Sequence, residues 1–145
     1  MSSCLVLYGR SNTGKTGTLM KLMDLIKSKG YLVINSTFPI DSFGDRRIIT
    51  EIKGKRIGIT SRGDTRAVLE EDYMWAGECD WFICASRTKG QTEDFINKSF
   101  STILWQKRWQ VLDDKLGFSF SALYDESQMN QAKMILELLE NILLK

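Results

Sequence analysis

Apolar residues in the first thirty positions follow two different patterns. The run from Cys4 to Tyr8 is continuously apolar, which is typical of a strand buried on both faces. Farther along, apolar residues recur every three or four positions, at Leu19, Leu22, Met23 and Ile26. This spacing predicts a helix from Thr16 to Lys29, and Gly30 is placed to end it.

The next segment favours strands. Two six-residue runs, Arg47–Ile52 and Lys55–Thr60, flank the dipeptide Lys53-Gly54, and we expect them to form an antiparallel hairpin. Before them, Tyr31–Ile34 predicts a strand. The segment between, residues 35–45, consists mostly of turn-forming residues.

The second half of the chain predicts further helices and strands. In chain order they are a helix from Thr65 to about Trp75, a strand Trp81–Ala85, a mainly helical stretch Thr92–Asp114, a strand Phe118–Leu123 and an apolar helix Gln128–Lys145. Alternating strands and helices imply a three-layer α/β/α sandwich, with a mostly parallel sheet of about five to six strands that includes the hairpin. We expect one domain over residues 1–145, with its ligand at the C-terminal strand ends.

Composition narrows the classes of function. The chain is 43% hydrophobic and 26% charged, as in ordinary soluble proteins. A net charge of +2 argues against a general nucleic-acid binder. The absence of histidine excludes His-based triads and His metal sites. No apolar run is long enough to suggest a membrane span, so we expect a cytoplasmic protein.

The segment after the first predicted strand reads Gly9-x-x-x-x-Gly14-Lys15-Thr16. Its glycines let the backbone approach an anion closely, and its N–H groups and the following helix end attract phosphate oxygens. Lys15 supplies a mobile cation for the outer phosphates, and the Thr16 hydroxyl is suited to bind magnesium. The expected nucleotide contacts are Gly9, Arg10, Ser11, Asn12, Thr13, Gly14, Lys15, Thr16 and Gly17.

Over its first thirty residues the chain therefore resembles the P-loop NTPases. The resemblance implies a nucleoside triphosphate, ATP or GTP, bound with Mg²⁺. It also implies an acidic residue near a neighbouring strand end on the metal side. Asp64 is the candidate for that role, with capping of the helix from Thr65 as its alternative and Asp41 and Asp45 in reserve. Asp80 precedes its strand, and we expect it at the opposite end of the sheet.

The predicted hairpin leading into Ser61 is similar in topology to the small GTPases. That family has an Asp-x-x-Gly loop where this chain reads Thr60-Ser61-Arg62-Gly63. Its guanine-reading motif ends in aspartate, and the nearest stretch here, Thr88-Lys89-Gly90-Gln91, ends in glutamine. An amide cannot accept both hydrogen bonds from guanine, so ATP is favoured.

Basic residues gather in loops that the predicted topology brings toward the phosphates: Arg10, Arg62, Arg66, Arg87 and Lys89. Arg62 and Arg87 are the strongest candidates for stabilising phosphoryl transfer, together with Lys15 and Asp64. These cations are alternatively suited to a second phosphorylated or anionic small molecule, or they are solvated surface groups.

The segment Trp105-Gln106-Lys107-Arg108-Trp109 interleaves aromatic and basic residues. Base stacking is one interpretation. Packed tryptophans with basic residues facing water is the preferred one, so nucleic acid is not the expected partner. The apolar final helix is expected to be buried, with a protein partner or homo-oligomer as the alternative.

Three functions remain open. The first is a small ATPase that hydrolyses Mg–ATP, with Asp64, Glu70 and Glu71 as candidates to position water. The second is a small-molecule or nucleotide kinase, although only Gly90–Lys115 has room for a lid. The third is a non-catalytic nucleotide sensor whose loops order around the γ-phosphate.

Overall fold

The structure is a computed structural model and describes residues 2–9, 13–87, 90–108 and 121–144. Its strands are β1 (Ser3–Tyr8), β2 (Leu32–Thr37), β3 (Arg47–Ile52), β4 (Lys55–Thr60), β5 (Trp81–Ser86) and β6 (Thr102–Lys107). Its α-helices are α1 (Lys15–Ser28), α2 (Arg66–Ala76), α3 (Gln91–Ser99) and α4 (Ser121–Leu138), and α4 continues into a π-helical turn, Leu139–Leu143. Within these residues the strands form one sheet in the order β2-β3-β4-β5-β1-β6.

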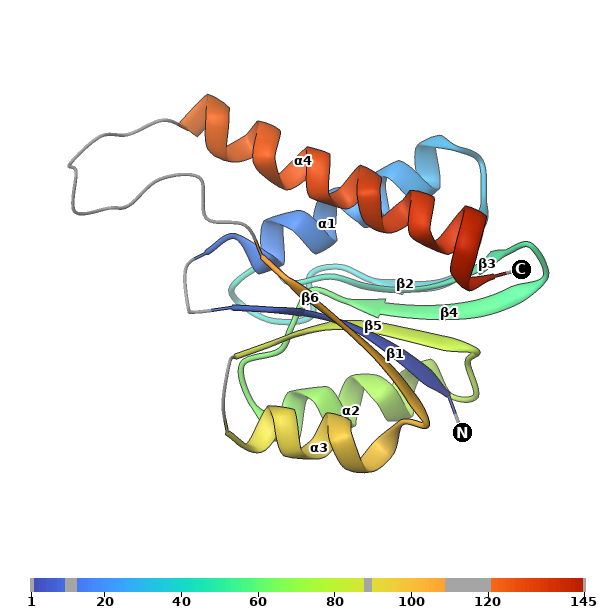
Figure 1. Ribbon diagram of the computed structural model, residues 1–145, viewed down its shortest axis with the longest axis vertical. Coiled ribbons are helices and arrows are strands. Elements are labelled where there is room, and N and C mark those ends of the chain that lie inside the picture. Colours follow the sequence, from blue (N-terminus) through green and yellow to red (C-terminus); the bar gives the residue numbers. More distant parts are fainter. Residues whose placement is uncertain (1, 10–12, 88–89, 109–120, 145) are drawn as a thin grey trace.

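Helices cover both faces of this mixed sheet. Helices α1 and α4 lie on one face and α2 and α3 on the other (Figure 1). Strand β1 shows why: Leu5 belongs to the core under α1 and α4, whereas its neighbours Cys4 and Val6 belong to the core under α2 and α3. Successive side chains of a strand point to opposite faces, so a fully apolar strand fills both cores.

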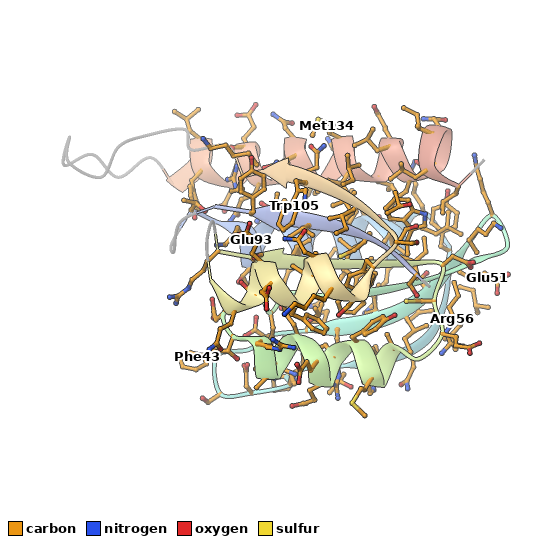
Figure 2. All side chains as sticks on the ribbon, turned by 60° about the horizontal axis from the view of Figure 1, so that its bottom comes forward. Phe43, Glu51, Arg56, Glu93, Trp105 and Met134 are labelled. Atoms are coloured by element: carbon orange, nitrogen blue, oxygen red, sulfur yellow. The ribbon has the colours of Figure 1, made fainter. Side chains whose placement is uncertain are left out.

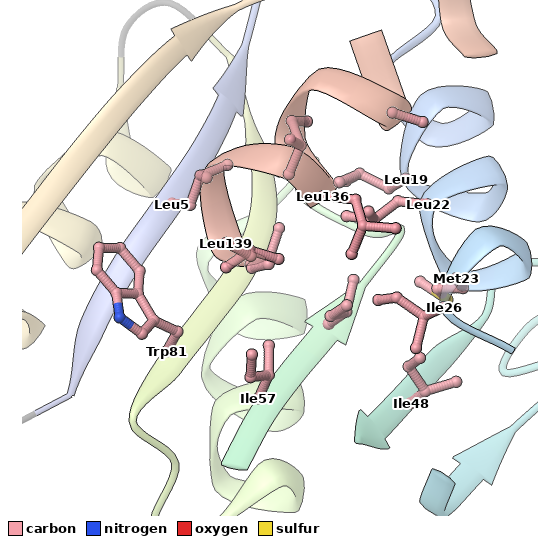
Figure 3. Packing of buried hydrophobic residues seen from close by; sticks show 14 of the residues in the cluster. Leu5, Leu19, Leu22, Met23, Ile26, Ile48, Ile57, Trp81, Leu136 and Leu139 are labelled. Carbon is pink, nitrogen blue, oxygen red and sulfur yellow. The ribbon is translucent and has the colours of Figure 1, made fainter. Parts of the chain in front are cut away.

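The two cores differ in chemistry. The core under α1 and α4 is mainly aliphatic, and Figure 3 shows Leu19 and Leu22 of α1 close to Leu136 of α4. The other core is aromatic, with the Phe82 and Phe100 rings stacked at 5.9 Å between centroids. All three cysteines are free and buried, and they pack in the core under α2 and α3 as small apolar residues.

Strand direction determines where the loops meet. Strands β4, β5, β1 and β6 are parallel, so their C-terminal ends share one edge of the sheet. Strand β3 pairs antiparallel with both β2 and β4. Because β5 lies between β1 and β4, the loops that follow β1 and β4 are separated by one strand.

Most predicted elements are confirmed. The hairpin strands Arg47–Ile52 and Lys55–Thr60 have the predicted bounds, and β1, α1, β2, α2 and β5 differ from prediction by a few residues at most. Asp80 lies at the N-terminal end of β5, as expected, and its carboxylate accepts a hydrogen bond from the Arg56 amide at 2.8 Å.

The mainly helical stretch predicted for Thr92–Asp114 is confirmed in its first part, where α3 covers Gln91–Ser99, and is wrong for Thr102–Lys107, which forms strand β6. Strand β6 pairs in parallel with β1, and this tertiary pairing outweighs the local helical pattern. The predicted strand Phe118–Leu123 is wrong for residues 121–123, which begin α4 seven positions before the expected helix start at Gln128. Residues 109–120 lie outside the described ranges.

Within the described residues, every helix is too short or too polar to span a bilayer.

Candidate functional site

The loop between β1 and α1 lies at the C-terminal edge of the parallel strands. Of the expected nucleotide contacts, Arg10, Ser11 and Asn12 lie outside the described residues. Gly14 precedes α1 with a left-handed φ of 95°, which a side chain would strain. Gly14, as the cap residue, has no side chain to cap the helix, and the first turn of α1 holds no acidic residue. The first N–H groups and the positive dipole end of α1 therefore suit an anion.

Lys15 lies across this loop. Its amino group donates hydrogen bonds to the carbonyl oxygens of Gly9 and, at 3.2 Å, of Ser86 at the end of β5. Burial lowers the pKa of Lys15, and the positive charge of Arg87 lowers it further, whereas Asp64 opposes the shift. The amine is thus a poorly solvated cation at the positive end of helix α1, an arrangement that favours an added negative charge.

Thr16 connects the loop to the end of β4. Its hydroxyl donates to the carbonyl oxygen of Ser61 at 3.3 Å. The Ser61 hydroxyl in turn donates to the carboxylate of Asp45 at 2.7 Å. Burial raises the pKa of Asp45, and the neighbouring Asp41 carboxylate raises it further, against the effect of the Ser61 hydrogen bond. Of the two reserve aspartates, Asp45 is therefore held next to Thr16 through Ser61.

Gly63 carries the loop after β4 over the end of β5. A Cβ at this position would lie 2.0 Å from the carbonyl oxygen of Ala85, so no side chain fits. The crossing brings Asp64 to the cavity that also contains Lys15 and Thr16. Thr65, rather than Asp64, caps α2, since its hydroxyl accepts the Val68 amide at 3.3 Å. Asp64 is exposed and not engaged as the cap.

Two adjoining cavities meet at Thr16 and Asp64. The first, which we call the loop cavity, has a volume of about 410 Å³ and is lined by Gly14, Lys15, Thr16, Gly17, Asp64, Arg87, Tyr124 and Gln128. The second, which we call the acidic cavity, has a volume of about 380 Å³ and is lined by Thr16, Asp41, Phe43, Asp45, Arg62, Asp64, Thr65 and Val68. The topology thus brings the loop, the β4 end and the segment after β2 together.

Arg62 lines the acidic cavity, but its guanidinium is held by Asp72. Nε donates to one carboxylate oxygen at 3.0 Å and Nη2 to the other at 2.5 Å. Asp72 is 1% exposed and also accepts from Arg47 and Thr60. The hydrogen bonds and charge of Asp72 raise the pKa of Arg62. This fork-shaped pairing joins β3, β4 and α2, so Arg62 has a structural partner where it was expected to meet phosphate.

The other basic residues separate into two groups. Arg87 is exposed and lines the loop cavity with Lys15 and Asp64, as expected of a phosphate contact. Arg66 instead pairs with Glu70 at 2.7 Å and with Asp94 at 3.6 Å, on the α2 and α3 side. Arg10 and Lys89 lie outside the described residues.

Sequence reasoning missed the contribution of α4. Gln128 is buried, and its amide nitrogen donates to the Gly14 carbonyl at 3.2 Å. Its oxygen accepts from Lys21 of α1 at 2.9 Å. Tyr124, one turn earlier, also lines the loop cavity. The polar spacing of Tyr124, Gln128 and Gln131 on one helical face is the signal that would have revealed them, had the helix been started early enough.

Arg108 was expected to face water and is instead 2% exposed. It follows β6, and its Nη1 donates to Ser127 at 2.9 Å and to Gln131 at 3.3 Å, both on α4. Burial lowers its pKa, partly offset by Tyr124. Arg108 therefore fixes the first half of α4 to the end of β6, beside the loop.

The described side chains alone do not form a complete metal site. Among the residues the structure describes, no three acidic, cysteine or histidine side chains are close enough to hold an ion by themselves. A magnesium ion at this edge would have to take its remaining ligands from phosphate and water, which is its usual mode of binding.

A larger cavity of about 800 Å³ lies elsewhere. Its lining is Ser3, Lys55, Glu78, Cys79, Asp80, Trp81, Leu143 and Leu144. These residues lie at the N-terminal end of the parallel strands and include none of the predicted site residues.

In comparisons with known proteins, no family model, no curated protein and no solved structure matches this chain.

Proposed function

We propose that the chain binds a nucleoside triphosphate with magnesium at the loop Gly9–Gly17 and hydrolyses it, with ATP as the favoured nucleotide. In this proposal the domain is P-loop NTPase-like. The resemblance of the loop sequence and the order of strand, loop and helix support it.

One observation carries the proposal. The buried Lys15 lies at the N-terminus of α1, where the cap residue Gly14 has a left-handed φ and no side chain to cap the helix. Lys15 has carbonyl partners but no carboxylate among its hydrogen bonds to described residues. An anion with several oxygens would satisfy the amine and the helix N–H groups together.

In this proposal, Thr16 and Asp64 hold the magnesium ion. When bound, magnesium would supply charge neutralisation between the outer phosphates. Thr16 and Asp64 line both cavities, and Asp45 approaches the same point through Ser61. We assign Thr16 as a direct ligand and Asp64 as a ligand directly or through water.

Asp64 is also the best candidate to orient an attacking water. Of the three carboxylates considered, Glu70 pairs with Arg66, and Glu71 pairs with Arg47 and Arg62. Only Asp64 among them lines the loop cavity. Arg87 faces the same cavity and would stabilise the charge that develops during transfer.

A kinase is the second candidate, and the acidic cavity favours it. This cavity adjoins the loop cavity and has room for a small acceptor. Asp41, Asp45 and Asp64 line it, and the charge of Arg62 is neutralised by Asp72. An acceptor here would therefore be neutral or cationic in preference to the phosphorylated molecule suggested by the basic loops.

The test is calorimetric titration of ATP, GTP and ADP with magnesium, with phosphate release followed in the same samples. The key variant is Lys15→Ala, with Lys55→Ala as its control, since Lys55 carries the same charge at the other end of the sheet. We expect Lys15→Ala to lower triphosphate affinity at least tenfold, because it removes a charge-assisted contact. Lys55→Ala should leave affinity unchanged.

Each outcome selects a function. Binding with phosphate release supports the ATPase. Binding without release until an acceptor is added supports the kinase, and binding without turnover under either condition supports a nucleotide sensor. Equal affinity in the wild type and Lys15→Ala would overturn nucleotide binding at this loop.

A further inference from the structure

Helix α4 forms one wall of the loop cavity. A Cβ placed on Gly14 would lie 2.5 Å from the Tyr124 hydroxyl and 2.9 Å from Cζ of the ring. A Cβ on Gly17 would lie 2.2 Å from the amide nitrogen of Gln128. The side chains of α4 therefore rest directly on the glycines of the loop, in space that any larger residue would fill.

The guanidinium of Arg108 packs over the ring of Tyr124. It lies 5.7 Å from the centroid of the ring, and Arg108 is held by Ser127 and Gln131 of the same helix. Tyr124 is nevertheless 37% exposed. A supported aromatic ring that keeps an accessible surface beside a phosphate-type loop has the properties of a stacking platform.

Gln128 adds hydrogen-bonding capacity next to that ring. Its amide nitrogen donates to Gly14 and its oxygen accepts from Lys21, so the head group is oriented by two partners. An amide presents both a donor and an acceptor, and each has capacity for a second bond. This combination matches the polar edge of a base or the hydroxyls of a ribose.

From this wall we propose that the nucleoside part of the bound triphosphate lies against α4, with the Tyr124 ring as its stacking platform and Gln128 as a polar contact. This inference rests on the proposed function and adds the location of the nucleoside. It makes Tyr124 and Gln128 determinants of nucleotide specificity.

The acidic cavity is the alternative location for the nucleoside. It also holds an aromatic residue, Phe43, which is 90% exposed. Figure 2 places Phe43 at the end of the molecule away from Glu51 and Arg56, the same end as the loop after β1 in Figure 1. Asp41 and Asp45 line this cavity and would repel the phosphates next to a nucleoside bound there. The carboxylates of Asp41 and Asp45 are better suited to lie near magnesium. Helix α4 is then the wall against which the nucleoside would lie.

The experiment compares two probes, Mg–ATP and inorganic magnesium tripolyphosphate, by calorimetry on the full chain. The second probe has the phosphates without the nucleoside. The variants are Tyr124→Leu, which keeps apolar volume on Gly14, Tyr124→Phe, which keeps an aromatic ring, and Phe43→Leu as the matched change in the acidic cavity. Tripolyphosphate affinity also reports whether each variant is folded.

We expect Tyr124→Leu to lose about 5- to 150-fold in ATP affinity, the range for loss of one base–aromatic stack. Its tripolyphosphate affinity should stay within about twofold, and both affinities should be retained in Tyr124→Phe and Phe43→Leu. A selective ATP loss in Phe43→Leu, or an equal change of both probes in Tyr124→Leu, would overturn the inference. So would wild-type affinities that fail to distinguish the two probes, although phosphate binding at the loop would then stand. If the wild type binds neither probe, the proposed function itself fails.

Discussion

The hydroxyl of Thr16 donates a hydrogen bond to the carbonyl oxygen of Ser61 at 3.3 Å and thereby joins the loop after β1 to the end of β4. These two strands are not neighbours, because β5 lies between them. The contact depends on the loop after β4 passing closely over the end of β5. Gly63 makes that passage, so the geometry of the site depends on a residue that carries no functional group.

Gly63→Ala should therefore affect both stability and metal-side chemistry. Its Cβ would meet the backbone of Ala85, which cannot rotate away, and overpacking of this kind costs about 1–3 kcal/mol. We expect a lower midpoint in denaturant and weaker magnesium-dependent ATP binding, since Asp64 would be displaced. Gly54→Ala is the control: it introduces strain at a φ of 75° in the distant hairpin turn. If Gly63→Ala binds ATP as tightly as Gly54→Ala does, the loop crossing does not position the site.

Asp72 should be one of the most sensitive positions for stability. It is 1% exposed and accepts hydrogen bonds from Arg47 and Arg62, so Asp72→Ala leaves two guanidinium groups without their shared carboxylate. Removing one partner of a buried ion pair typically destabilises by about 3–5 kcal/mol. The neighbouring Glu71 contacts the same two arginines from an exposed position, and Glu71→Ala should cost at most about 1 kcal/mol. Chemical denaturation of the two variants measures the difference, and similar values for both would contradict the central role of Asp72.

The lowered pKa of Lys15 predicts two dependences on pH of opposite sign. As pH rises between the lowered folded-state value and the ordinary value of 10.5, the unfolded chain holds more protons than the folded one. The free energy of unfolding of the protein without phosphate therefore rises with pH across that window, because the cost of burying the charged Lys15 amine disappears. Bound phosphate favours the protonated amine, so tripolyphosphate affinity should fall through the same window, by up to about tenfold per pH unit.

Lys15→Arg separates this titration from that of other groups, because arginine stays charged at every pH of interest. The variant should show a flatter affinity profile between neutral pH and pH 10 than the wild type does. If the affinities of the wild type and Lys15→Arg fall equally with pH, Lys15 is not the group whose titration controls phosphate binding.

Gly17 and Gln128 should behave as a coupled pair. Gly17→Ala places a methyl group where the Gln128 amide lies, and this flexible side chain can move aside at the expense of its bond to Gly14. Gly17→Ala and Gln128→Ala should each lose about 1 kcal/mol of stability from that hydrogen bond. The double variant should lose little more than either, and full additivity in a double-mutant cycle would contradict the contact.

The sequence predicted the parts of this structure that local pattern determines. The strand at the continuous apolar run Cys4–Tyr8, the hairpin around Lys53-Gly54 and the helix that begins near Thr65 were all identified from neighbouring residues. Each of these signals lies within a few positions of the element that it specifies. The loop residues Gly14, Lys15 and Thr16 were placed for the same reason.

The missed features depend on contacts between distant residues. Strand β6 pairs with β1. Its Thr102, Ile103 and Trp105 are residues that favour strands, but the helical pattern of the longer stretch Thr92–Asp114 concealed them. Arg62 was expected at the phosphates because no local pattern indicates that Asp72, ten positions later on α2, holds it. Gln128 and Tyr124 meet the loop across more than a hundred residues of sequence, so their contact with Gly14 follows from the folded arrangement and not from any local pattern.

The hydrogen bonds of Lys15 have a final consequence for selectivity. This amine donates hydrogen bonds to the carbonyl oxygens of Gly9 and Ser86. A ligand must replace those bonds, so the binding energy is a difference between two sets of contacts and not their sum. In the proposed function, a single sulfate or phosphate would satisfy the amine and some of the helix N–H groups. A chain of phosphates would reach more of these donors at once, so we expect the loop to favour several linked anionic groups over a single one.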